Sequence, residues 1–394
     1  MKPGYKQTEV GVIPEEWEVK PLGAFVGYTN GKAHEQSISD SGRFVVVNSK
    51  FISTEGLTRK YSHHSFCPAS TGDVLMVMSD VPNGRAIAKC YWVESDNTYT
   101  VNQRICILNP HGIDGKLLFY KLDRNPFYLA FDDGAKQTNL RKDDVLACPL
   151  GIPKSDAEQR AIATALSDVD ALLGGLDRLI AKKRDLKQAA MQQLLTGQTR
   201  LPGFHAEWEV KRLGDVASLS KGAQLHSSET EEGGKFAHLN GGITPSSYTH
   251  KSNTAGNTIA ISEGGNSCGF VQFLTEPYWC GGHCYSVIPN GVDNHFLYQA
   301  LKGQQSAIMG LRVGSGLPNV QKTGLLAFKI HLPSTLPEQT AIASVLSEMD
   351  GELAVLEQRR EKTRALKQAM MQELLTGRTR LVSREAAKNA KEQK

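Results

Sequence analysis

The sequence predicts an α+β fold with two globular α/β domains separated by a long antiparallel two-helix coiled coil, arranged as a pseudo-two-fold internal repeat. The first observation is that residues 157–201 align without a gap with residues 337–381, at an offset of 180. The second is that both copies carry apolar residues alternately three and four positions apart, the heptad pattern of a left-handed coiled coil. The third is that the segments outside these copies contain short strand-like runs and dissimilar loops. Two copies of the same segment with dissimilar inserts between them suit a protein that recognises two different targets.

The composition is that of an ordinary globular protein. The chain has 394 residues, of which 40% are hydrophobic and 22% charged, and its length suggests two or three domains. We expect neither a membrane span nor an export signal, and hence a cytoplasmic protein, because the sequence has no run of 18 apolar residues and no basic and apolar leader. Seven cysteines, an odd number, fit reduced thiols. A net charge of +4 permits nucleic-acid binding without requiring it.

Each copy of the repeat is predicted to be one long helix. The segments 155–158 and 335–338 each place a hydroxyl residue at the N-cap and a glutamate three positions later, which is a capping box. Gly197 and Gly377 stand where a glycine commonly ends a helix. About 40 residues lie between these signals, or roughly 60 Å of helix.

The heptad stripe predicts how the two helices pack. Two nearly identical helices in one chain favour an intramolecular antiparallel pair with one insert at each end, over a coiled coil that only dimerises the chain. Lys183, Lys187, Arg360 and Lys367 interrupt the stripe, so there it either drifts around the helix or meets a polar partner. The residues assigned to the helix pair are Ile162, Leu166, Val169, Leu173, Leu176, Ile180 and Leu194 in the first copy, and Ile342, Leu346, Met349, Leu353, Leu356, Met370 and Leu374 in the second.

The repeat is also circularly permuted. Thr8 and residues 16–23 recur as Thr199 and residues 207–214, at an offset of 191. The segment that follows the first helix therefore has its counterpart at the N-terminus of the chain. We expect residues 1–17 to pack near the end of the second helix.

The inserts, residues 20–153 and 211–333, share a skeleton but differ in their loops. Gly31 corresponds to Gly222 and Asn48 to Asn240. Strands are predicted at residues 44–47, 74–78, 104–108 and 258–261, and helices at 115–131 and 294–309.

The insert loops are polar and mostly non-acidic. Their Lys, Arg, Asn, Gln and Ser side chains can hold phosphates or read base edges, although a solvated turn explains any single loop better when it is taken alone. The candidate DNA contacts of the first insert are Lys32, His34, Asn48, Lys50, Ser79, Asn83, Arg85, Gln103, Arg104, Lys136, Gln137 and Asn139. Those of the second are Lys221, Gln224, Asn240, Ser262, Asn266, Ser315 and Asn319.

Three segments of the frame resemble the DNA-specificity subunits of type I restriction–modification systems. They are Met-Gln-Gln-Leu-Leu-Thr-Gly-Gln-Thr-Arg-Leu-Pro-Gly-Phe at 191–204, the opening at 4–14 followed by Trp17, and the Glu-Gln pairs at 158–159 and 338–339. The resemblance extends to about Leu381 and is weak in the inserts. It implies target recognition domains at 1–154 and 201–334 and spacer helices at 155–200 and 335–381. The tail at 382–394 is charged and lacks bulky aliphatic and aromatic residues beyond its start, so we expect it to be disordered or loosely helical.

The resemblance also implies a function. Each recognition domain would read one half of a bipartite, asymmetric site in double-stranded DNA, while the helices set the spacing and dock two methyltransferase (modification) subunits. Restriction and translocase subunits would complete the assembly. The chain itself would be non-catalytic and hold no cofactor or metal; S-adenosylmethionine, ATP and Mg²⁺ would bind to the partner subunits.

The sequence contains only weak matches to motifs that would let the chain itself catalyse a reaction. Residues 125–128, Asn-Pro-Phe-Tyr, imitate the loop of adenine methyltransferases but lack its second proline and a glycine-rich cofactor loop. No phosphate-binding Gly-x4-Gly-Lys-Ser/Thr sequence occurs. Cys268, Cys280, His283 and Cys284 could bind zinc, but buried thiols explain them better.

Two other functions stay open at this point. A self-sufficient restriction or modification enzyme would bind S-adenosylmethionine, or cut DNA with magnesium, on its own. A coiled-coil scaffold without DNA affinity would show no salt-dependent binding to random duplex DNA.

Overall fold

A computed structural model describes residues 3–82, 84–230, 233–314 and 316–381 of the chain. The structure has two compact units. Unit 1 comprises Met1–Gly175 with Arg360–Lys394, and unit 2 comprises Leu176–Arg359. The tail at 382–394, for which we expected disorder, lies outside the described residues. No helix among the described residues combines the length and the apolar character that a membrane crossing requires.

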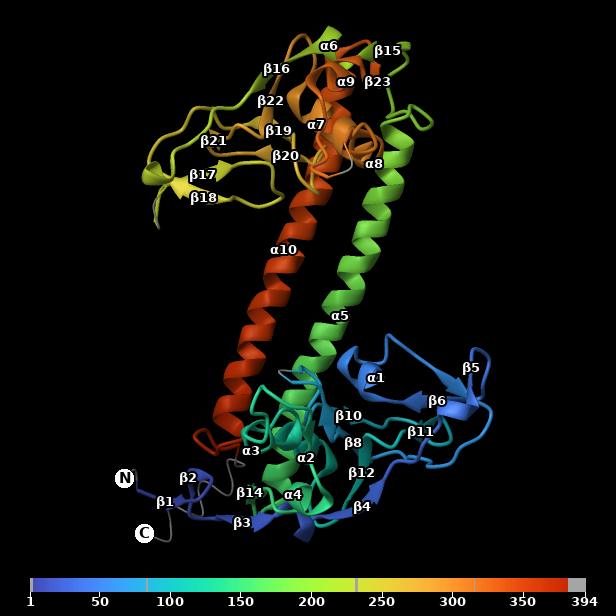
Figure 1. Cartoon of the computed structure of the whole chain (residues 1–394), viewed down its shortest axis with the longest axis vertical. Helices are drawn as coiled ribbons and strands as arrows, with labels where there is room; N and C mark the ends of the chain where they lie inside the picture. The colour runs from blue at the N-terminus through green and yellow to red at the C-terminus, as the bar shows by residue number, and fades with distance from the viewer. Residues whose placement is uncertain (1–2, 83, 231–232, 315, 382–394) are drawn as a thin grey trace. The chain divides into compact units, whose positions relative to one another are not determined.

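Two 39-residue helices, α5 (Asp156–Leu194) and α10 (Leu336–Leu374), run through both units (Figure 1). Each unit therefore contains the start of one long helix and the end of the other. Gly197 and Gly377 follow the helix ends with φ of +73° and +71°, the left-handed conformation that a C′ glycine favours. The predicted helices and their glycine stops are confirmed.

The helix segments in unit 2 run antiparallel. Lys183 Nζ lies 2.6 Å from Glu352 Oε2, and the next pair toward the end of α5, Lys187 with Asp350, uses an earlier residue of α10. Where Lys183 and Lys187 interrupt the apolar stripe of α5, they therefore pair with acidic side chains of α10.

The helix segments in unit 1 have the same direction. Lys367 Nζ, near the end of α10, lies 2.6 Å from Asp170 Oδ1. Glu158, in the first turn of α5, pairs with Arg380, which follows the end of α10. The predicted antiparallel arrangement is thus present in both units.

The heptad stripe faces inward. Its buried members are Ile162, Leu166, Leu176, Ile180, Leu194, Ile342, Leu346 and Leu374, and its half-buried members are Val169, Leu173, Met349, Leu353, Leu356 and Met370. A neighbouring stripe on α5 stays at the surface, with Leu172, Leu179 and Leu186 between 40% and 48% exposed.

The insert of unit 1 is built on two four-stranded sheets. The first has the order β10 (Cys90–Trp92), β8 (Val74–Val77), β12 (Ile105–Pro110), β4 (Val26–Asn30), and the second the order β11 (Tyr99–Val101), β6 (Phe44–Val47), β7 (Tyr61–Ser62), β5 (Ile38–Ser39). Strand β8 is buried on both faces because side chains alternate along a strand. Val74 and Met76 enter one apolar cluster, and Leu75 and Val77 enter another.

Shorter elements complete unit 1. They are β1 (Tyr5–Thr8), β2 (Gly11–Pro14), β3 (Trp17–Pro21), β9 (Ser79–Asp80), β13 (Thr138–Asn139), β14 (Pro149–Pro153), α1 (Ser49–Ser53), α2 (Gly115–Leu122), α3 (Pro126–Leu129) and α4 (Lys142–Leu146). Short 3-10 turns lie at Leu22–Ala24 and Glu35–Ser37. Strand β3 pairs with β14 and β9 pairs with β13, both antiparallel.

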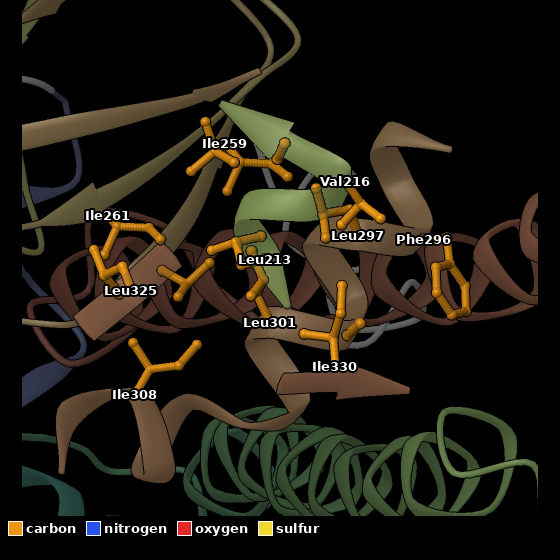
Figure 2. Packing of buried hydrophobic residues seen from close by; sticks show 14 of the residues in the cluster. Leu213, Val216, Ile259, Ile261, Phe296, Leu297, Leu301, Ile308, Leu325 and Ile330 are labelled. Atoms are coloured by element: carbon orange, nitrogen blue, oxygen red, sulfur yellow. The ribbon is translucent and has the colours of Figure 1, made fainter. Parts of the chain in front are cut away.

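The insert of unit 2 repeats this plan. One sheet has the order β16 (Ala217–Lys221), β22 (Cys284–Pro289), β19 (Thr258–Ser262), β20 (Val271–Leu274), and the other the order β18 (Ser247–Thr249), β17 (Phe236–Leu239), β21 (Trp279–Cys280). The remaining elements are β15 (Trp208–Arg212), which pairs with β23 (Lys329–Pro333), and α6 (Leu213–Val216), α7 (Asn294–Gly303), α8 (Gln305–Met309), α9 (Lys322–Ala327) and a 3-10 turn at Ser227–Glu229. Figure 2 shows their apolar core, in which Ile259 and Ile261 of β19 lie among Leu297 and Leu301 of α7 and Leu325 of α9.

The strands predicted at 44–47, 74–78, 104–108 and 258–261 are confirmed, with ends that differ by at most two residues. The segments predicted to be helical, 115–131 and 294–309, do form helices, and each is divided into two. In the first, Arg124 adopts a positive φ of 55° and Pro126 starts a new helix. In the second, α7 ends at Gly303 and α8 restarts at Gln305, whose Oε1 accepts a hydrogen bond from Val271 N.

The N-terminal hairpin packs against the end of α10, as the permuted repeat predicted. Tyr5 OH donates a hydrogen bond to Gly377 O at 3.0 Å. From α2, Lys121 Nζ donates to Leu375 O at 2.7 Å and lies 5.0 Å from the centre of the Trp17 ring. Burial lowers the pKa of Lys121 to about 7.

The lowered pKa of Lys121 predicts a pH-dependent stability. An unfolded lysine stays protonated up to about pH 10.4, whereas the folded one loses its proton near pH 7. The unfolded chain therefore binds more protons above pH 7, and the free energy of unfolding rises with pH through this residue. Replacing Lys121→Met should reduce that rise between pH 7 and pH 9 in urea titrations of the full chain. Lys154→Met, at an exposed lysine, is the control; equal slopes for the two variants would contradict the assignment.

Candidate nucleic-acid interface

Five loops of unit 1 converge on one surface, which we call the first rim (residues 30–34, 47–50, 78–85, 101–105 and 136–140). Backbone hydrogen bonds of 2.8–3.0 Å join them: Gly31 N to Ile105 O, Lys32 N to Val101 O, Asn102 N to Val47 O, Met78 N to Arg104 O, and Leu140 N to Met78 O. Gly31 is required here, because a Cβ on it would collide with the carbonyl oxygen of Asn102. The structure thus brings together the loops that hold the described candidates of the first insert.

Exposed candidates in the first rim are mostly basic. Lys32, Lys50, Arg85, Arg104 and Lys136 are exposed, and we retain them as predicted DNA contacts. Gln103 is also exposed and donates a hydrogen bond to Glu35 Oε1 at 3.1 Å. Asn83 lies outside the described residues.

Three candidates of the first rim have structural roles instead. His34 is 1% exposed, and its ring nitrogens lie 2.6 Å from Lys32 O and 2.8 Å from Thr100 Oγ1, so it has no free edge for DNA. Asn48 caps α1 through its Oδ1, which accepts from Phe51 N at 2.9 Å. Ser79 is 7% exposed. The loop pattern could not distinguish these inward side chains from outward ones.

Ser79 nevertheless joins two candidates in one polar cluster. Its hydroxyl donates to Asn139 Oδ1 at 2.7 Å and accepts from Gln137 Nε2 at 2.7 Å. Gln137 and Asn139 are exposed; the pairing of β9 with β13 places Asn139 opposite Ser79, and the hydrogen bond to Ser79 holds Gln137. Their amides are therefore held in place before any ligand arrives.

The second rim is the equivalent surface of unit 2 (residues 221–224, 239–242, 262–267, 280–284 and 313–320). The same pattern of backbone hydrogen bonds joins its loops at 2.8–2.9 Å: Gly222 N to Cys284 O, Ala223 N to Cys280 O, Gly281 N to Leu239 O, Glu263 N to His283 O, and Val320 N to Glu263 O. Gly222 has the role of Gly31, since a Cβ on it would collide with the Gly281 and Cys280 carbonyl oxygens.

The candidates of the second rim are less basic. Lys221 Nζ lies 2.7 Å from Glu263 Oε1, so the one lysine proposed there is paired with an acid. Gln224, Asn266 and Asn319 are exposed. Ser315 lies outside the described residues.

Two further candidates of the second rim point inward. Asn240 Oδ1 accepts a hydrogen bond from His283 N at 3.1 Å and so shapes the rim. Ser262 is fully buried at the end of β19, so its side chain is not accessible to DNA.

Buried polar residues at the starts of the long helices were missed as functional positions. Glu338 is fully buried, and both of its oxygens pair with Arg200, at 2.6 Å to Nε and 2.7 Å to Nη2. Glu158, 3% exposed, pairs with Arg380 in the same way, with Nη2 at 2.7 Å from Oε2. The sequence assigned these glutamates to capping boxes. Ser155 Oγ does accept from Glu158 N, at 3.4 Å, but the carboxylates bind arginines. Arg200 and Arg380 are 180 positions apart, as are Glu158 and Glu338, and this shared offset is the sequence signal that could have identified the pairs.

The adjacent glutamines attach each insert to its helix. Gln159 Oε1 accepts from Asp114 N at 2.8 Å, and its Nε2 donates to Pro153 O at 2.9 Å. Gln339 Oε1 accepts from Asp293 N at 2.9 Å, and its Nε2 donates to Pro333 O at 2.8 Å.

The motifs examined for catalysis have other roles. Asn125 caps α3, with Oδ1 accepting from Phe127 N at 2.9 Å, while its amide donates to Lys121 O at 2.8 Å. All seven cysteines are buried and free. Within the described parts of the chain, no group of three or more His, Cys, Asp or Glu side chains is arranged to hold a metal ion.

Comparisons with known proteins agree with this architecture. Residues 14–181 and 205–364 match the family model of the type I restriction modification DNA specificity domain. A putative type I specificity subunit of Mycoplasma pneumoniae is 34% identical over 175 residues, which cover 44% of this chain and 46% of that protein. A similar relative in Mycoplasma genitalium is matched over 39% of its length, so the chain spans less than half of these two relatives.

Other similarities span the chain. The specificity subunit of the type I restriction enzyme MjaVIII from Methanocaldococcus jannaschii is 28% identical over 409 residues, covering 94% of each chain. The crystal structure of a type I restriction–modification S subunit from M. genitalium superposes with a TM-score of 0.72 at 20% identity, covering 95% of this chain and 99% of that one. At this identity the structural likeness shows the fold.

The glutamate–arginine pairs predict a large stability loss from one substitution. Glu338→Ala would leave the Arg200 guanidinium without its carboxylate in a partly buried place, which costs about 3 kcal/mol of unfolding free energy. Glu209→Ala breaks an ion pair in which both side chains are 43% exposed and should cost less than about 1 kcal/mol. Denaturant unfolding of both variants measures the difference; similar losses would contradict a special role for Glu338.

Proposed function

This chain belongs to the DNA-specificity subunits of type I restriction–modification systems, the non-catalytic part of those complexes, and we propose that its two inserts each read one half of a bipartite, asymmetric DNA site. The observation that carries the proposal is the pair of rims: the same backbone connections join the loops in both units, and different side chains line them. Major-groove readout needs such polar side chains on a fixed backbone. In this proposal residues 1–154 and 201–334 are the recognition domains.

The first rim is suited to double-stranded DNA because it collects exposed cations. Lys32, Lys50, Arg85, Arg104 and Lys136 come from five different loops and can neutralise phosphates or reach base edges. The second rim relies more on amides, since Lys221 is paired with Glu263. An asymmetric DNA site requires two recognition surfaces with different side chains, and here both are built on the same backbone arrangement.

The long helices, which we take as residues 155–200 and 335–381, are proposed to set the spacing between the half-sites. Each contains 39 helical residues, or about 58 Å, and major-groove positions on one face of DNA recur about every 34 Å. A packed helix pair is stiff enough to fix a distance of this order.

The same frame is proposed to dock two modification subunits in the cytoplasm. Its duplicated helix ends, with Met191, Leu195 and Thr196 matched by Met371, Leu375 and Thr376, offer two similar surfaces. The docked subunits would flip and methylate a base with S-adenosylmethionine, and added restriction subunits would use ATP and Mg²⁺ to translocate and cut unmethylated DNA. A self-sufficient enzyme is disfavoured by the structural role of Asn125.

Exchange of one insert tests the two-reader proposal. Replacing residues 20–153 with those of a related specificity subunit should change one half of the methylated sequence and leave the other half intact, because each half is read by one unit. Methylome sequencing of cells that carry the complete system measures both halves. The reciprocal exchange of residues 211–333 must change the other half. A single exchange that altered both halves would refute the proposal.

Lengthening the helices tests their role in spacing. Seven residues added to α5 and to α10 at facing positions lengthen the pair by about 10 Å, or about three base pairs of DNA, while keeping the heptad register. The spacer between half-sites should lengthen accordingly, or methylation should be lost. Substituting one heptad without changing its length is the control. An unchanged spacer in the lengthened protein would exclude the helices as its determinant.

A further inference from the structure

The two rims carry opposite chemistry at one hydrogen-bonded pair of equivalent positions. Backbone hydrogen bonds define the equivalence, because Met78 N bonds to Arg104 O in the first rim as Glu263 N bonds to His283 O in the second. Asn139 and Asn319, related by the offset of 180, lie beside these residues, pairing with Ser79 and bridging to Gly264 respectively. Met78 thus corresponds to Glu263, and Arg104 to His283.

Glu263 presents a fixed hydrogen-bond acceptor. Its Oε1 accepts from Lys221 Nζ and from Tyr285 OH, both at 2.7 Å. Its Oε2 has only a 3.9 Å contact with His283 Nδ1, and it makes no hydrogen bond among the residues that the structure describes. The side chain is 14% exposed, so it is held firmly at the base of the rim with one oxygen free.

The chain beside Glu263 leaves room for a ligand. Gly264 and Gly265 follow it, and a Cβ on Gly265 would meet nothing within 4 Å. The nearest atom to a Cβ on Gly264 would be His283 Nδ1 at 3.7 Å. Two residues without side chains permit close approach of a base edge to the carboxylate.

The equivalent place in the first rim has a donor instead. Met78 is 8% exposed, and its sulfur accepts from Tyr28 OH at 2.9 Å, so it offers DNA no acceptor. Arg104 is exposed, and its guanidinium has no partner in the described ranges of the chain. The first rim therefore presents a cation where the second presents a carboxylate.

Building on the proposed function, we propose that Glu263 accepts a hydrogen bond from the exocyclic amino group of a cytosine in the second half-site, and that Arg104 donates to a guanine in the first. Carboxylates accept from cytosine N4, and arginine donates to guanine O6 and N7 in the major groove. Adenine suits Glu263 less well, because its N7 acceptor adjoins the amino group and would repel a carboxylate. The two recognition domains would then have opposite hydrogen-bonding polarity at this pair of positions, with the carboxylate on one partner in the second rim and the guanidinium on the other partner in the first.

Selection from a randomised duplex pool by the full chain tests this assignment. The wild type should select a bipartite sequence with a cytosine in the second half. Glu263→Gln replaces the free acceptor with an amide that can donate, so preference at that one position should move about tenfold toward a base with an acceptor, thymine or guanine. The first half-site should not change.

Two further variants separate base reading from structural effects. Lys251→Met removes an exposed cation of unit 2 that lies outside the second rim, so the cytosine preference should persist. Arg104→Gln, at an exposed position, should weaken one guanine preference in the first half only, whether or not Glu263→Gln folds well.

Unchanged half-sites in both Glu263→Gln and Arg104→Gln would overturn the inference and leave the two-reader proposal standing. Loss of the cytosine preference in Lys251→Met would also overturn it, because the preference would then follow the charge of unit 2 and not the carboxylate of Glu263. A wild type that selects no bipartite sequence would instead refute the proposed function.

Discussion

Glu158 and Glu338 place a carboxylate inside the protein at the first turn of each long helix, and each requires one arginine from beyond the end of the other helix. A buried carboxylate without a partner costs several kcal/mol, so the arginine cannot be elsewhere in the folded state. Arg380 therefore brings the end of α10 to the start of α5 in unit 1, and Arg200 brings the end of α5 to the start of α10 in unit 2. The antiparallel direction follows from these pairs, whereas the apolar stripe by itself would permit a parallel pair.

The same first turns position the recognition surfaces. Gln159 and Gln339 bind the backbone at Asp114 and Asp293, which are the N-caps of α2 and α7. Strands β12 and β22 end shortly before these caps and begin at the rims, next to Arg104 and His283. Each rim is thus connected to a long helix through one strand and one capped helix, without a flexible segment between them. Rigid support of this kind fixes side chains for reading bases.

Local patterns predicted most of the fold. The heptad stripe, the C′ glycines, the strands and the permuted N-terminal segment depend on residues near one another in sequence, or on repetition of the frame. The roles of loop residues depend on distant partners. His34 was proposed for DNA, but its hydrogen-bond partner is Thr100, 66 positions away. Glu263 was overlooked because acidic residues repel phosphates; its chemistry depends on Lys221 and Tyr285, which the sequence does not place beside it. The break at Arg124 follows from Asp123, whose carboxylate accepts from Cys90 N and holds the helix end against a strand.

A duplicated backbone with interchangeable side chains explains how one frame supports two unlike readers. Gly31 and Gly222 let the loops meet in both units because neither has a Cβ, and the hydrogen bonds that join the loops are made by the backbone. Side chains at the rim can then change charge, as between Met78 and Glu263, without loss of these bonds. A new acid still requires local neutralisation, and the second rim provides it by placing Lys221 and Tyr285 around Glu263. The side chains that recognise bases therefore change in small groups of neighbouring residues. The buried glutamate–arginine pairs and the apolar stripe of the long helices keep the rest of the structure unchanged.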